Sequence, residues 1–166
     1  ENAEIQEDSV EFAEFSAALR EVSLELAMQI AKDGEGATRL FSAEVINARD
    51  KQNAIKAAKA VVSSNLVKAA IFGEDANWGR IICAIGYSGA ELVPEKVDMW
   101  VESKAGSEQM MKDGAGLAFD EEKAKTILQE KEIKILIDLK DGNAKTTAYG
   151  CDLTYDYIKI NADYRS

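Results

Sequence analysis

The spacing of apolar residues changes along this chain, and that change constrains the fold more than any other feature of the sequence. In the first forty residues, large apolar side chains recur every three or four positions, which places them on one helix face: Phe12, Phe15, Leu19, Val22, Leu26 and Ile30. Further on, every second residue is apolar, as in a strand with one buried face: Ile133, Ile135, Ile137 and Leu139. Both periods together predict an α/β fold of the α+β type, with mixed sheets packed against helices.

Capping residues and glycines indicate where the helices begin and end. Asp8 or Ser9 is predicted to cap the first helix, and Gly34 is predicted to follow its end, since glycine accepts the left-handed conformation that terminates helices. Further helices are predicted over residues 50–63, 66–72 and 120–129, and from residue 153 onward. In the last helix, Tyr157 and Ile160 predict that the chain end docks on the body of the protein.

Strands are predicted between these helices. The segments are 39–47, 80–87, 97–103, 132–139 and 145–151. Segment 80–87 is almost continuously apolar, which indicates a strand buried on both faces. Residues 107–116 are predicted to be irregular, and Asp141-Gly142 predicts a hairpin that joins the last two strands.

Length and composition favour a single globular unit. A chain of 166 residues with 46% hydrophobic residues can bury a sizeable core. Residues 1–166 are therefore predicted to form one compact unit, with a weak internal seam near Pro94. The chain starts at Glu1 without a methionine or a signal-peptide pattern, which favours a processed chain or a piece of a larger one.

Charge and residue usage exclude several classes of function. The net charge of −10 disfavours binding to nucleic acid and to anionic membrane surfaces. The absence of histidine excludes a Ser-His-Asp triad and a His-ligated zinc within the chain, and no metal site is predicted. Cys83 and Cys151 are predicted to be buried free thiols, although a bridge between them is compatible with the sequence.

Three segments carry more glycine and polar residues than folding alone requires. They are 33–38, 72–80 and the C-terminal stretch that begins at Gly150. Glu35 lies between two glycines, so its backbone is free to approach a ligand. Each segment also has a purely structural interpretation: a helix C-cap, a turn anchored by Trp78, and a frayed tail.

Taken together, these segments resemble the ornithine acetyltransferase family, whose members are also called glutamate N-acetyltransferases or bifunctional arginine-biosynthesis proteins. The resemblance runs in order over essentially the whole chain and rests on four motifs: Lys32-Asp33-Gly34-Glu35-Gly36-Ala37-Thr38, Ser64-Asn65-Leu66-Val67-Lys68-Ala69-Ala70, Phe72-Gly73-Glu74-Asp75-Ala76-Asn77-Trp78-Gly79-Arg80-Ile81, and Gly150-Cys151-Asp152-Leu153-Thr154 with Asn161-Ala162-Asp163-Tyr164-Arg165-Ser166. The family commonly has proline at the position of Asn65.

The resemblance implies the N-terminal-nucleophile architecture of this family and an enzyme of arginine biosynthesis located in the cytoplasm. Such an enzyme transfers acetyl from N-acetylornithine to glutamate through an acetyl-threonine intermediate. It needs no cofactor, although some members also use acetyl-CoA as a donor. The precursor cleaves itself before the nucleophilic threonine, whose freed α-amine serves as the base.

The resemblance assigns substrate binding to three residues of this chain: Glu35, Asn161 and Ser166. It places the catalytic threonine upstream of Glu1, so the chain corresponds to the C-terminal part of the β-chain and is expected to be inactive alone. The expected partners are the α-chain, the missing start of the β-chain and further αβ heterodimers. Asn77, Trp78 and Arg80 are interpreted as structural, and Arg39 receives no role. The alternative is a non-catalytic amino-acid-binding or assembly module on the same scaffold.

Overall fold

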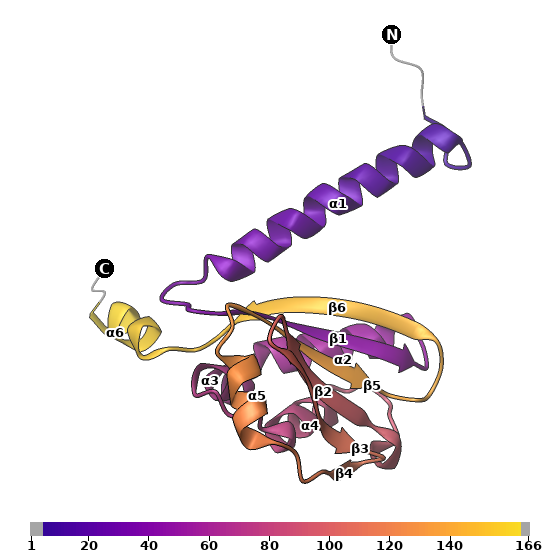
Figure 1. The fold of residues 1–166 in the computed structure, drawn as a ribbon. Coiled ribbons are helices and arrows are strands. Elements are labelled where there is room, and N and C mark those ends of the chain that lie inside the picture. The colour runs from indigo at the N-terminus through magenta and orange to yellow at the C-terminus, as the bar shows by residue number, and fades with distance from the viewer. Residues whose placement is uncertain (1–4, 164–166) are drawn as a thin grey trace.

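The computed structural model describes residues 5–163 and has a six-stranded mixed sheet at its centre (Figure 1). The strand order is β4-β3-β2-β5-β1-β6. One interior pair, β1 with β5, is parallel, and all other neighbouring pairs are antiparallel. The strands are β1 (Leu40–Ala48), β2 (Asp98–Ser103), β3 (Gly106–Lys112), β4 (Ala115–Gly116), β5 (Glu132–Asp138) and β6 (Ala144–Cys151).

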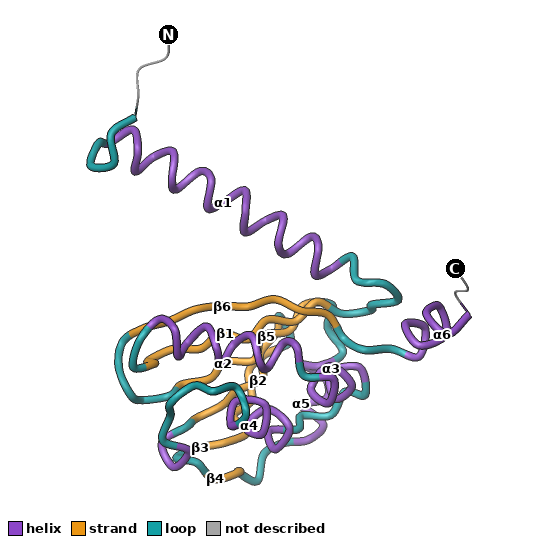
Figure 2. Tube along the Cα trace, turned by 180° about the vertical axis from the view of Figure 1, so that it is seen from behind, coloured by secondary structure: helices purple, strands orange, loops and turns teal. Residues whose placement is uncertain are grey.

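One hydrophobic core joins the sheet to four of the helices. The side chains of Phe41, Val45, Ile135 and Ile137 are fully buried in it, which confirms the one-faced pattern predicted for residues 132–139. Figure 2, seen from behind, shows α2 and α4 in front of the strands. The helices are α1 (Val10–Lys32), α2 (Lys51–Ser63), α3 (Asn65–Phe72), α4 (Trp78–Gly86), α5 (Glu121–Leu128) and α6 (Tyr155–Asp163), with a 3-10 turn at Pro94–Lys96.

Helices α1, α2 and α5 begin where the sequence predicts, and Ser9 is one of the two caps proposed for α1. The side chains of Ser9, Asp50 and Asp120 each accept a hydrogen bond from a backbone N–H in the first turn of α1, α2 and α5. Helix α1 ends at Lys32, directly before the Asp33-Gly34 turn, as predicted.

The strand predicted over residues 80–87 is wrong, because this segment lies in helix α4. The Asn77 side chain caps the helix by accepting from Arg80 N at 3.0 Å. Ile81, Ala84 and Ile85 are buried at helical spacing, whereas Cys83 is exposed. A short apolar run fits a buried strand and a buried helix equally well, so periodicity alone does not separate the two.

The irregular segment predicted over residues 107–116 is also wrong, since it forms β3 and β4. The pairing of β2 with β3 shifts register between Met99 and Trp100. Met110 and Met111 are both buried, although they are consecutive. This irregularity removes the strict alternation by which a strand is recognised in a sequence.

Asp141-Gly142 does not form the predicted hairpin. Strand β6 pairs with β1 rather than with β5, and β1 lies between the two. The connection therefore crosses the end of β1, where Asp141 N donates to Asn47 O at 2.8 Å. A Cβ on Gly142 would stand 2.4 Å from Ala48 O, so the glycine is required for backbone clearance rather than for a tight turn.

Helix α1 extends away from the sheet, beside its edge strand β6 (Figure 1), and has no buried residue. Arg20, Ser23 and Leu24 line a cleft together with Thr147 and Tyr149. The apolar residues that share one face of α1 form a stripe: Phe12, Phe15, Leu19, Val22, Leu26 and Ile30. Most of them are more than half exposed, with Phe15 at 56%, Leu26 at 53% and Ile30 at 76%. A stripe of this kind ordinarily faces a core. No helix in residues 5–163 is both long enough and apolar enough to span a membrane.

Helix α6 likewise has no buried residue. Tyr157 and Ile160 are about two-fifths exposed, so these two side chains are not the anchors that the sequence predicted, and residues 164–166 of the chain end lie outside the described residues. The Tyr155 ring meets the Phe72 ring edge-on, with 5.5 Å between ring centroids.

The Gly142 crossing yields a stability test. We expect Gly142→Ala to lower the free energy of unfolding by about 1–3 kcal/mol, because the added Cβ collides with backbone atoms of Ala48 and Arg49. The matched control is Gly86→Ala, where a Cβ meets nothing within 4 Å at the end of α4. Urea unfolding measures the stability of both variants. Equal stability of the two would contradict the conclusion that the chain at Gly142 passes close to the end of β1.

Candidate functional site

Two of the three residues assigned to substrate binding meet in the structure. Asn161 Nδ2 donates a hydrogen bond to Glu35 Oε2 at 2.6 Å, although 126 positions separate them in the chain. The same amide donates to Tyr157 O at 2.9 Å, within its own helix α6. Both Glu35 and Asn161 are exposed, so the pair is open to solvent. Ser166, the third residue, lies outside the described residues.

The two glycines beside Glu35 allow its loop to approach the chain end closely. Gly36 has φ +68°, and a Cβ there would stand 2.8 Å from Tyr157 N. A Cβ on Gly34 would stand 2.5 Å from Cys151 Sγ. Any larger residue at either position would push the loop away from the end of β6 and the start of α6.

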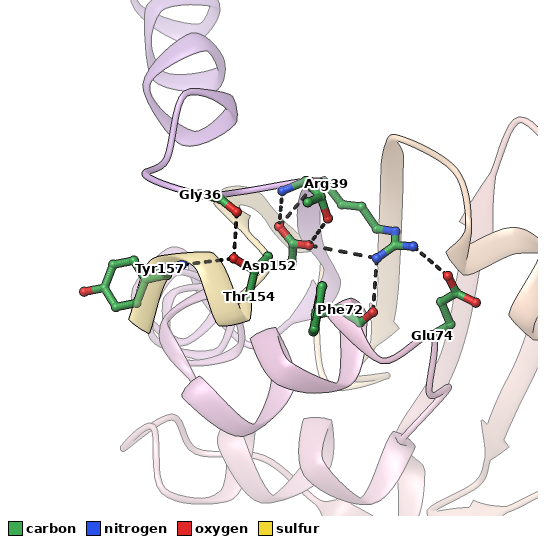
Figure 3. Close-up of polar contacts among 8 residues, drawn as sticks. Gly36, Arg39, Phe72, Glu74, Asp152, Thr154 and Tyr157 are labelled. Carbon is green, nitrogen blue, oxygen red and sulfur yellow. Dashed lines mark hydrogen bonds and ion pairs between the residues drawn. The ribbon is translucent and has the colours of Figure 1, made fainter. Parts of the chain in front are cut away.

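The carboxylate of Asp152 holds the strand side of this loop (Figure 3). It accepts hydrogen bonds from Thr38 N at 2.8 Å and Arg39 N at 3.0 Å, and also from the Thr38 hydroxyl. The side chain of Asp152 is fully buried, with Arg39 Nη1 3.9 Å from Asp152 Oδ2. Backbone N–H groups and the guanidinium together stabilise the buried negative charge.

The hydroxyl of Thr154 holds the helix side of the loop. It donates to Gly36 O at 2.7 Å and accepts from Tyr157 N at 3.2 Å, in the first turn of α6 (Figure 3). The loop that carries Glu35 is thus joined to the helix that carries Asn161 through one buried oxygen atom.

Arg39 connects the site to the rest of the fold. Its Nη1 donates to Phe72 O at 3.1 Å, and its Nη2 donates to Glu74 Oε1 at 2.7 Å. Glu74 has φ +57° and also accepts from Gln129 Nε2. The sequence interpretation missed the role of Arg39. The available signal was that Arg39 directly follows one recognised motif, that Glu74 lies in another, and that the two carry opposite charges.

The other motif residues have structural roles, as interpreted from the sequence. Arg80 donates to Leu66 O at 3.0 Å, and the Trp78 ring packs against the core under Gly116. Cys83 and Cys151 are both free, as predicted, but neither is fully buried: Cys83 is exposed and Cys151 is partly exposed.

The chemistry available at the Glu35–Asn161 pair is recognition of a small polar ligand. A carboxylate attracts an ammonium group, and a primary amide both donates and accepts hydrogen bonds. Within residues 5–163, the structure brings no three Cys, Asp or Glu side chains together in a way that would hold a metal ion.

Comparisons with known proteins agree on one family. The ArgJ family model matches residues 1–166. The Arginine biosynthesis bifunctional protein ArgJ of Caldanaerobacter subterraneus is 54% identical over the whole chain, which covers 41% of that protein. The protein of the same name from Thermotoga neapolitana is 50% identical over 99% of the chain, which covers 42% of it.

A solved structure shares the fold. It is the crystal structure of Arginine biosynthesis bifunctional protein ArgJ from Bacillus halodurans, with a TM-score of 0.90 and 45% sequence identity. The match covers 98% of this chain and 75% of that one, so the α/β architecture is that of an ArgJ protein. The chain spans about two-fifths of the length of the curated relatives.

The Arg39–Glu74 contact gives a testable coupling. Arg39 is 13% exposed and Glu74 is 24% exposed, so little solvent screens the pair. We expect a double-mutant cycle of Arg39→Met and Glu74→Ala to give a coupling of about 1–2 kcal/mol in urea unfolding. The control cycle uses Lys32 and Glu132, which are more than 60% exposed, and should give less than about 0.5 kcal/mol. Equal couplings would show that Arg39 does not anchor the site.

Proposed function

The chain belongs to the ArgJ family, whose model matches all 166 residues, and from this premise we propose that it forms the C-terminal part of an amino-acid acyltransferase of arginine biosynthesis. The complete protein transfers acetyl from N-acetylornithine to glutamate, and acetyl-CoA is a possible second donor. The observation that carries the proposal is the contact of Glu35 with Asn161, which joins two motifs from opposite ends of the chain at an open surface.

Substrate chemistry fits the two side chains. N-acetylornithine keeps one ammonium group, and glutamate carries its ammonium group when it first binds; an exposed carboxylate such as that of Glu35 attracts either group. The Asn161 amide offers a donor and an acceptor to the polar atoms next to that group. Ser166 is proposed as a third contact through its hydroxyl. Binding a substrate between Glu35 and Asn161 replaces their mutual hydrogen bond with bonds to the ligand.

The bond-breaking groups are proposed to lie in the rest of the protein. A threonine at the start of the β-chain, released by autocatalytic cleavage, attacks the acetyl carbonyl, and its own α-amine takes the hydroxyl proton. Ornithine leaves as the amine with the proton that the α-amine took up. The neutral amine of glutamate then attacks the threonine ester and takes the acetyl group, and the proton that it gives up restores the threonine hydroxyl. This mechanism requires no histidine and no cofactor, and the chain contains no histidine. A cytoplasmic location is part of the proposal, and the two free thiols fit a reducing compartment.

Replacing the Glu35 carboxylate tests the site. In the complete protein, we expect Glu35→Gln to lower kcat/KM by about 10- to 100-fold for both amino-acid substrates, because the charge that binds the ammonium group is lost. The control is Glu132→Gln, which removes the same charge from an exposed carboxylate that pairs with Lys32 near the same loop. Acetyl exchange between ornithine and glutamate measures both.

Three results would contradict the proposal. An unchanged kcat/KM in Glu35→Gln would remove Glu35 from the site. Acetyl transfer by residues 1–166 alone would show that the nucleophile lies within this chain. Binding of the amino acids by the complete protein without any transfer would favour the alternative, a non-catalytic binding module.

The remaining part of the protein is proposed as the partner that covers helix α1. Leu24 lies on the face of α1 that is turned toward β6. Successive residues of a helix are about 100° apart around its axis, so Leu26 lies on the opposite face of α1. An exposed stripe of this size is rarely left in water. The chain covers only 41% of a relative's length, so more than half of an ArgJ protein is available to cover it. That part comprises the proposed α-chain and the start of the β-chain, and pairs of αβ heterodimers would associate further.

Thiol labelling of the complete protein tests this contact. We expect cysteines at Leu19→Cys and Leu26→Cys to react about tenfold more slowly than one at Glu21→Cys, on the polar side of α1. Peptide-resolved mass spectrometry separates these thiols from Cys83 and Cys151. Equal rates would show an uncovered stripe, and protection that is lost on dilution would assign the stripe to a second copy instead.

A further inference from the structure

Asp152 and Thr154 are buried polar residues between the end of β6 and the start of α6, each 3% exposed. Neither side chain reaches the open surface where Glu35 and Asn161 meet. Both bind the backbone on either side of the Glu35 loop. We infer that Asp152 and Thr154 are positioning residues that fix the separation of Glu35 and Asn161 for the substrate, an inference that rests on the proposed function.

Thr154 joins the two backbones that carry the pair. Its hydroxyl donates its only proton to Gly36 O, directly after Glu35, and accepts from Tyr157 N. Tyr157 lies one helical turn before Asn161, whose amide donates to Tyr157 O. A continuous path of hydrogen bonds therefore leads from the Glu35 loop through Thr154 to Asn161.

Asp152 fixes the other side of the same loop. Its three hydrogen bonds from Thr38 and Arg39 hold the backbone where the loop enters β1. With Gly34 and Gly36 in close contact with Cys151 and the start of α6, the loop has no room to move toward the chain end. Glu35 is thus held by anchors on one side and by steric contact on the other.

This arrangement separates the rigid part of the site from its adaptable part. Two exposed side chains can part to admit a ligand, while the backbones below them keep their spacing. Fixing the spacing in advance lowers the entropy that binding would otherwise cost. The effect should therefore appear in substrate binding rather than in the bond-breaking step, whose groups lie elsewhere.

Thr154→Val and Thr154→Ser in the complete protein test the inference. Valine has nearly the same shape but lacks the hydroxyl. We therefore expect KM for N-acetylornithine and KM for glutamate to rise about tenfold, with kcat changed less than about twofold. Serine keeps the hydroxyl and should restore KM to within about twofold of the parent value. The control is Thr126→Val, which removes a hydroxyl bond to Glu122 O within α5, on the surface.

Hydrogen exchange separates this inference from the proposed function. In Thr154→Val, amides of residues 34–39 should exchange about tenfold faster than in the parent, whether or not the protein transfers acetyl. A parent that transfers no acetyl refutes the proposed function, and the positioning role for substrate with it, whereas the exchange rates still report the structural link. In an active parent, an unchanged KM in Thr154→Val would overturn the positioning role alone. A fall in kcat and thermal stability with KM unchanged, or no rescue by serine, would also overturn it and leave Thr154 as a structural residue.

Discussion

The buried carboxylate of Asp152 is the interaction on which the rest of the site depends. It lies directly after β6 and accepts three hydrogen bonds from Thr38 and Arg39, directly before β1. These strands are antiparallel neighbours, so the carboxylate closes their shared end. Arg39, which this carboxylate holds through its backbone N–H, reaches Phe72 and Glu74 with its side chain, and Thr154, two residues after Asp152, joins the Glu35 loop to α6. A buried charge is tolerated only when it is neutralised in this way, so the fold and the site require each other.

Much of the fold follows from local sequence rules, and the errors arise where tertiary pairing decides. Periodicity and capping residues predicted α1, α2, α5 and β5, because each has a clear apolar spacing or an N-cap. Segment 80–87 was predicted with the wrong period, since a short apolar run fits both structures. Strand β6 pairs with β1 because β1 lies between β5 and β6, parallel to β5. No local sequence pattern predicts that parallel pair. Gly142 is a residue type that is typical of turns, but its role is to let the chain pass close to the backbone at the end of β1.

The site shows the same division between local and long-range information. Motif resemblance selected Glu35 and Asn161, and the structure brings them together. It did not predict that Asp152, Thr154 and Arg39 form the support, because their partners lie more than 30 positions away or are backbone atoms. Backbone carbonyl and N–H groups have no signature in a sequence. The exposed stripe on α1 is a third case, in which helical periodicity correctly predicts an apolar face without indicating what covers it.

A crystal structure of the complete protein with ornithine bound tests the central claim most directly, because ornithine carries the ammonium group without the transferable acetyl. We predict that an ammonium nitrogen of the ligand lies within about 3.2 Å of a Glu35 carboxylate oxygen. We also predict that the Asn161 amide turns from Glu35 to the ligand, while the hydrogen bonds of Asp152 and Thr154 stay in place. Ornithine bound elsewhere, with the Glu35–Asn161 hydrogen bond intact, would contradict the central claim.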